Sequence, residues 1–157
     1  MLQEMLAGAA KTMASVPYCW LVTKADGVHA RPMGRLPPEA GEDALTVRFI
    51  TDDRSRKAAE IRRDGVVTAI FDNQANDAYV AVTGRATLQE DRSEVRRRWR
   101  RGYDLYFPSE DDRAHAAFVE VAVERLELWI RGITPEPFGM RTTVLEQDGD
   151  GWRLVGS

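Results

Sequence analysis

The stretch 118–130 is the part of the sequence that most restricts how this chain can fold. Its apolar residues alternate with others, which predicts a β-strand with one buried face. The alternation changes phase by one residue near Glu124, which predicts a β-bulge and a strong bend. A long, curved strand favours a closed barrel, because closure removes the exposed edges of a sheet. The alternating residues are Val119, Val121 and Val123, followed by Leu126, Leu128 and Ile130.

Shorter elements precede and follow this strand. Apolar spacing predicts helices over 2–13, 54–63 and 91–103. Alternation predicts strands over 18–23, 28–34, 45–51, 66–71 and 79–88, and a final hairpin over 142–155. Gly84 indicates a bulge or a close backbone approach within its strand, and residues 104–114 are expected to be irregular. The sequence therefore predicts one α+β domain over 1–157, mainly β, with about six core strands.

Composition excludes several classes of protein. The net charge of −3 over 157 residues gives no overall basic field that would attract nucleic acid. No apolar run approaches the roughly 20 residues that span a bilayer, and the start of the chain does not resemble a signal peptide, so a cytoplasmic location is expected. The single cysteine, Cys19, lies in an apolar run and is expected to be buried and inert. His29 and His115 lack metal-ligand spacing, so no metal site is predicted.

The segment 96–101 is basic and contains Trp99, a combination that also occurs in nucleic-acid-binding proteins. Acidic residues surround it on both sides. A solvated helix face that forms its own ion pairs is the favoured interpretation. The acidic residues are Glu90, Asp91, Glu94, Asp104, Glu110, Asp111 and Asp112.

A candidate phosphate site lies where the strand 45–51 meets the following helix. Thr51 ends the strand, Ser55 and Lys57 begin the helix, and Arg31 belongs to a neighbouring strand. Amide groups at a helix N-terminus point outward, and the helix dipole favours an anion there. A hydroxyl, a lysine and an arginine at this place suit a phosphate monoester. The alternative is that Ser55 is an ordinary helix cap and Arg31 a solvated strand residue.

Several motifs in a fixed order resemble the pyridoxamine 5′-phosphate oxidase-like superfamily of FMN-binding split barrels, and most closely its general stress protein branch. The resemblance covers about residues 2–132, and 133–157 resemble an extension found in some members. It implies a six-stranded antiparallel split β-barrel with flanking helices, which forms a homodimer with FMN sites at the subunit interface. The motifs are Arg31-Pro32-Met33-Gly34, Phe49-Ile50-Thr51, Ser55-x-Lys57, Glu60-Ile61, Val82-x-Gly84-Arg85-Ala86, Asp91-Arg92, Trp99, Phe107-Pro108 and Glu127-Leu128-Trp129.

The resemblance also implies which residues bind FMN. Arg31 and Lys57 would neutralise the phosphate, and Ser55 and Thr51 would donate hydrogen bonds to it, with Arg56 as a further candidate. Along the ribityl chain and the ring would lie Pro32, Met33 and the backbone of Phe49, Ile50 and Thr51. Trp129, and as further candidates Trp99 or Phe107, would come from the partner subunit. Trp129 lies on the polar face of its strand, which independently favours an interface. His29 shares a strand face with Arg31 and is a further candidate neighbour of the flavin.

The function implied is that of a flavin-dependent oxidoreductase that uses reduced nicotinamide, with no catalytic side chain that can be named. The sequence has no counterpart of the substrate-binding Arg and His residues of true pyridoxamine phosphate oxidases, so oxidation of that vitamin is not expected. Two alternatives stay open. The chain could bind flavin or sense redox state without turnover, or its barrel could hold a deazaflavin or haem.

Overall fold

The structure is a computed structural model that describes residues 1–156, and strand β6 (Ala116–Ile130) holds its sheet together. β6 pairs with β5 (Ala78–Gln89) over most of its length, with β3 (Val47–Asp52) through its first half, and with β7 (Thr143–Asp148) near its end. The register with β5 shifts between Thr83 and Gly84, so that Glu124 has no partner across the ladder. The predicted bulge at Glu124 is thereby confirmed.

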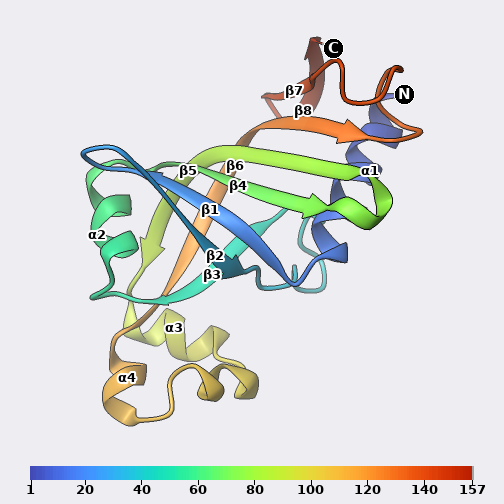
Figure 1. Ribbon diagram of the computed structural model, residues 1–157. Helices are drawn as coiled ribbons and strands as arrows, with labels where there is room; N and C mark the ends of the chain where they lie inside the picture. The colour runs from blue at the N-terminus through green and yellow to red at the C-terminus, as the bar shows by residue number, and fades with distance from the viewer. Residues whose placement is uncertain (157) are drawn as a thin grey trace.

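The remaining strands complete an eight-stranded antiparallel sheet. Its order is β2-β1-β4-β5-β6-β7-β8, and β3 joins from the side by pairing with β6. The bounds are Tyr18–Lys24 for β1, Val28–Gly34 for β2, Val66–Asn73 for β4 and Gly151–Gly156 for β8. Because β6 bends at its bulge, it carries β3 around toward β2 (Figure 1). β2 and β3 do not pair with each other within residues 1–156, so the barrel is split between them.

Helix α1 (Leu2–Ser15) covers one part of the barrel core. It buries Met5, Ala9 and Met13 against β4, β5 and β6. Inside the barrel, fully buried apolar side chains from most of the strands fill the space, among them Leu21, Phe49 and Phe71. A mainly β antiparallel fold with flanking helices is therefore confirmed. The hairpin of β7 and β8 adds two strands to the six expected in the barrel, in the segment predicted to be an extension.

The predicted helix 91–103 is wrong in its second half. Helix α3 (Arg92–Arg98) is capped by the side chain of Asp91, but the backbone becomes extended at Trp99. The indole of Trp99 then packs edge-on against Tyr103 and Phe107 and donates to Asp104 at 2.8 Å. This tertiary contact outweighs the local helical spacing. A 3-10 helix, η2 (Arg101–Leu105), follows.

The segment 104–114 is also not wholly irregular, because α4 (Glu110–Ala114) forms within it. The hydroxyl of Ser109 accepts a hydrogen bond from the Asp112 amide, and three acidic residues occupy the first turn, where the helix dipole favours them. Together α3, η2 and α4 lie beyond one end of the barrel, whereas β7 and β8 lie beside α1 at the other (Figure 1). No helix within residues 1–156 is both long and apolar enough to cross a membrane.

Candidate functional site

A cleft of about 730 Å³ opens where β2 and β3 separate. One wall comes from the end of β2 and the residues that follow it, and the floor from the end of β3. The third side comes from η2 and the residues after it. The cleft therefore lies at the split of the barrel. Its lining residues are Pro17, Tyr18, Pro32, Met33, Gly34, Arg35, Leu36, Pro37, Ile50, Thr51, Asp52, Lys57, Gly102, Tyr103, Tyr106, Phe107 and Asp112.

Lys57 lines this cleft and has neither an ion pair nor a side-chain hydrogen bond within residues 1–156, whereas Arg35, the other cation of the lining, donates to the carbonyls of Ala44 and Thr46. Helix α2 (Arg56–Arg63) carries it, and its side chain is half-buried. Arg54 and Arg56 on either side pair with Asp52 and Glu60, but Lys57 forms no ion pair with any of residues 1–156. Burial lowers the pKa of the Lys57 ammonium, and the neighbouring Arg31 guanidinium lowers it further, while Asp52 acts in the opposite direction. A bound anion would favour the charged form of Lys57.

Arg31 lies near Lys57 but is engaged by other groups. Its guanidinium donates to the hydroxyl of Thr23 at 2.7 Å and lies 3.6 Å from the carboxylate of Glu60. Glu60 is only 5% exposed and also accepts from Thr23 and Arg56. Glu60 therefore holds Arg31 beside the cleft rather than within its lining. The sequence analysis gave Glu60 no role beyond its place in a motif, and the spacing of four residues from Arg56 was the signal that could have indicated an ion pair.

Ser55 and Thr51 lie at the N-terminus of α2. The hydroxyl of Ser55 accepts from the Ala58 amide at 3.3 Å, so Ser55 is the helix cap. Its oxygen lies 3.4 Å from the hydroxyl of Thr51, which lines the cleft. The amides of Arg56 and Lys57 precede the first hydrogen bonds within the helix, so they are available to an anion. Hydroxyls, helix amides and the Lys57 ammonium are together the donor set that a phosphate monoester requires.

Of the residues expected along the ribityl chain and ring, Pro32, Met33 and Ile50 line the cleft. Phe49 does not, because its side chain is fully buried in the barrel core. Only its backbone could therefore approach a ligand, which is the contact that the sequence analysis assigned to it.

The aromatic wall of the cleft was largely missed by sequence reasoning. Tyr18, Tyr103, Tyr106 and Phe107 line it, and Tyr106 is 70% exposed. Burial raises the pKa of the Tyr103 hydroxyl, so this group stays protonated and can donate a hydrogen bond. The dense spacing of aromatic residues over 103–107 was the available signal. The lining of the cleft thus combines the Lys57 ammonium with four aromatic side chains.

Trp129 does not reach this cleft within one chain. It lies on the outer face of the sheet, opposite Tyr79 in the ladder of β5 and β6. Its expected contact with a ligand bound to the partner subunit stays a prediction.

The other candidate residues also have clear places. Trp99 is half-buried against a satellite core formed by Val95, Phe107, Ala116 and Phe118. Phe107 lines the cleft of its own chain. His29 contacts the Arg56 guanidinium rather than the cleft, and Arg56 itself is held by Glu60.

The ion-paired interpretation of the segment 96–101 is confirmed for Arg97, Arg98 and Arg100. Arg97 and Arg98 pair with Glu94, Arg98 also with Glu120, and Arg100 with Glu39. Cys19 is buried, which raises the pKa of its thiol to about 12 and leaves it unreactive. Residues 1–156 contain no cluster of side chains that could hold a metal ion.

The model of the family described as "Pyridoxamine 5'-phosphate oxidase like" matches residues 5–136. The chain belongs to this family. The matched segment contains the split barrel and every residue of the cleft. No curated protein matches the chain.

Solved structures share the fold at low sequence identity. A Clostridium acetobutylicum protein related to general stress protein 26 superposes with a TM-score of 0.74 at 14% identity, over 92% of this chain and 95% of the other. An FMN-binding, pyridoxamine 5′-phosphate oxidase-related protein of Nostoc punctiforme gives 0.68 at 14% identity, over 98% and 95%. PhzG of Burkholderia lata, in complex with tetrahydrophenazine-1-carboxylic acid, gives 0.66 at 17% identity, over 99% and 89%. At these identities the likeness concerns the fold.

Proposed function

We propose that this protein binds FMN in the cleft between β2 and β3, with the phosphate at Lys57 and the isoalloxazine ring toward the aromatic wall. The observation that carries the proposal is the half-buried Lys57 ammonium, which has no partner within residues 1–156 although its cationic neighbours are paired. Burying a cation without a counter-ion is unfavourable, so the site is suited to a ligand that supplies the anion. The family match and the FMN-binding relative support FMN as that ligand.

The proposed roles follow the geometry. Lys57 and the first amides of α2 bind the phosphate, while Thr51 and Ser55 donate hydrogen bonds to it. Arg31, held by Glu60, contributes its positive charge from the side. Met33 and Ile50 contact the ribityl chain and ring, and Tyr103 and Tyr106 close the opposite side.

The activity we propose is that of an oxidoreductase. Bound FMN supplies hydride transfer from a reduced nicotinamide to an acceptor or oxygen, and the protein binds the flavin, orients it and excludes water.

A non-catalytic flavin-binding or redox-sensing role is the second candidate. It is favoured by the lining of the cleft, which contains no histidine or cysteine within residues 1–156. Steady oxidation of NAD(P)H with an added acceptor would favour the enzyme, whereas tight flavin without turnover would favour the binding protein. A deazaflavin or haem in the same cleft would be recognised by its absorption spectrum.

The phosphate assignment is tested with Lys57→Ala and two ligands. FMN binding should weaken by about 1.5–3 kcal/mol, the contribution of a charge-assisted hydrogen bond. Riboflavin, which lacks the phosphate, should bind the variant and the wild type equally. Fluorescence titration of both flavins measures this, with Arg62→Ala on the outer side of the same helix as control. Equal loss for both flavins, or no loss for FMN, would overturn the assignment.

We also propose a homodimer in which each cleft is completed by the partner subunit. An exposed apolar row crosses the outer face of the sheet from the rim of the cleft, where Pro32 pairs with Trp20 and Trp20 pairs with Ile70. Trp20 is 50% and Ile70 37% exposed. The row continues through Ala81 to β6, which carries Trp129 on the same face. A second copy packed on this face would bury the row and bring outer-face residues to the cleft.

A further inference from the structure

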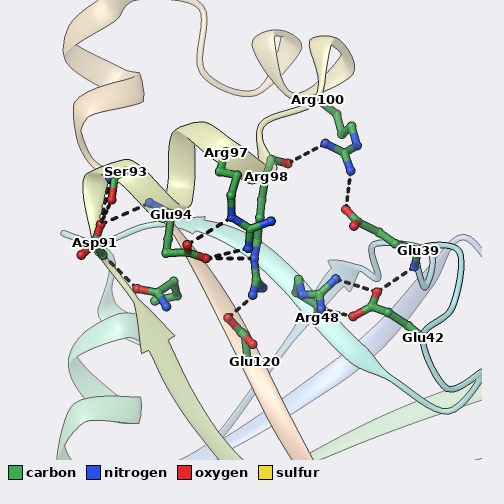
Figure 2. Close-up of polar contacts among 11 residues, drawn as sticks. Glu39, Glu42, Arg48, Asp91, Ser93, Glu94, Arg97, Arg98, Arg100 and Glu120 are labelled. Carbon is green, nitrogen blue, oxygen red and sulfur yellow. Dashed lines mark hydrogen bonds and ion pairs between the residues drawn. The ribbon is translucent and has the colours of Figure 1, made fainter.

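A cluster of ion pairs joins the loop after β2, β3, α3 and β6 (Figure 2). None of its residues is among those proposed to bind the flavin. The cluster surrounds a small hollow of about 280 Å³. Leu36, Pro37 and Tyr103 line both this hollow and the cleft, so they are the partition between the two. The other residues around the hollow are Glu39, Arg48, Arg98, Arg100 and Phe118.

The residues of β3 and β6 at the base of the cluster are wholly or partly buried and form ion pairs. Arg48 of β3 is 9% exposed and forms a two-nitrogen contact with the carboxylate of Glu42. Next to it in the ladder of β3 and β6 stands Glu120, which pairs with Arg98 at 3.1 Å. Strands β3 and β6 therefore place one arginine, Arg48, beside one glutamate, Glu120, and each forms an ion pair with a residue of a neighbouring segment.

Two irregular segments meet on top of this base. The loop after β2 is tied to it because the amide of Glu39 donates to Glu42 at 2.7 Å. Arg100 directly precedes η2, and its guanidinium pairs with the Glu39 carboxylate at 2.7 Å. Glu39 and Arg100 thus join the segment that carries Leu36 and Pro37 to the segment that carries Tyr103 and Tyr106.

Within residues 1–156 the pair of Glu39 and Arg100 is the only ion pair or hydrogen bond between the loop after β2 and the segment 99–107, although Tyr103 also packs edge-on against Trp99 and Phe118. η2 has no side-chain cap at its N-terminus, and Leu105 and Tyr106 point into solvent, 86% and 70% exposed. The pair of Glu39 and Arg100 is therefore the one polar contact, within residues 1–156, between the segment of the aromatic wall and the loop after β2.

We propose that Glu39 and Arg100 form a clasp that positions the aromatic wall of the cleft against the β2 wall. This inference rests on the proposed function, because the ligand that the aromatic wall contacts is the flavin ring. The clasp acts on the ring end of the cleft, whereas Lys57 acts on the phosphate end. Comparing FMN with riboflavin, which lacks the phosphate, therefore distinguishes the role of the clasp from the role of Lys57.

The test uses Glu39→Gln, Arg100→Gln and the charge-swapped double variant E39R/R100E. Each single variant should weaken FMN and riboflavin by the same factor, about twofold to fivefold, which is the range for an exposed ion pair. The swapped variant should restore both affinities. The ratio of FMN to riboflavin affinity should stay at the wild-type value throughout, unlike in Lys57→Ala.

The control is the pair of Arg62 and Glu90, which matches the clasp in length, 2.7 Å, and in exposure, 44% and 43% against 53% and 43%. Arg62→Gln and Glu90→Gln should leave both flavin affinities unchanged. Hydrogen exchange of the flavin-free protein gives a second readout, in which amides of 100–107 should exchange faster in the single clasp variants and recover in the swapped one.

Unchanged flavin affinity and unchanged exchange in the single variants would overturn the clasp, as would a swapped variant that fails to recover. If the wild type binds no flavin at all, the proposed function fails. The clasp is then judged by the exchange of 100–107 alone, which requires no ligand.

Discussion

At Gly84 the backbones of β5 and β6 approach too closely for any side chain. A Cβ atom at this position would lie 2.2 Å from the carbonyl oxygen of Ala122, opposite the bulge at Glu124. Gly84→Ala should therefore lower the free energy of unfolding by about 2–3 kcal/mol, since the backbone has to shift to relieve the clash. Gly102→Ala is the matched control, because a Cβ atom added at Gly102 would have no neighbouring atom within 4 Å. Denaturant unfolding compares the two, and an unchanged Gly84→Ala would contradict this close approach.

Single residues also show which features of the site could be predicted from the sequence and which could not. The order of Arg31, Ser55 and Lys57 was enough to predict that Arg31 lies near the start of the helix that carries Lys57, since strand and helix boundaries follow from local patterns. The pairing of Arg31 with Glu60 was not predictable, because it depends on how α2 packs against β1. The consequence is that Lys57, rather than Arg31, is the unpaired cation.

Among the elements, β3 and the loop before it are joined by the pair of Arg48 and Glu42. The Arg48 guanidinium holds the pKa of the Glu42 carboxyl at about 2, well below its ordinary value. A carboxyl with a lowered pKa in the folded state stabilises the protein above its ordinary pKa, and that contribution is lost as the pH falls toward about 2. Glu42→Gln should therefore cost about 1 kcal/mol near neutral pH, after allowance for its partial exposure.

The difference between Glu42→Gln and wild type should disappear between about pH 4 and about pH 2, where the wild-type carboxyl also becomes neutral. Denaturant unfolding at a series of pH values measures this. Glu90→Gln, in an exposed pair with Arg62, is the control that should stay close to wild type. A difference that persists at low pH would mean that shape, not charge, makes Glu42 stabilising.

Elements defined by local patterns were the predictable part of the fold. The bulge in β6 could be located because alternation is a local property of the strand. The end of α3 could not, because Trp99 leaves the helix in order to pack against Tyr103 and Phe107. The same contact builds the aromatic wall, so the part of the cleft that the sequence missed is the part created by tertiary packing.

For the whole molecule, the proposed homodimer would form through the outer face of the sheet. Trp20, at the centre of the exposed apolar row, has Pro32 on one side and Ile70 on the other. A glutamate there would be buried without a partner in an assembled dimer, which is strongly unfavourable. Trp20→Glu should therefore shift the protein from dimer to monomer in sedimentation experiments. Thr87→Glu, at an exposed position of β5 beyond the register shift at Gly84, should stay dimeric.

Flavin binding and assembly should then be lost together, because the proposed site needs residues of both subunits. The monomeric Trp20→Glu variant should bind FMN more weakly than the wild type even though Lys57, Thr51 and Met33 are unchanged within each chain. Sedimentation with detection at the flavin absorption band follows both properties in one experiment. A monomer that still holds FMN tightly would show that the cleft of one chain is sufficient, and it would remove Trp129 from the site.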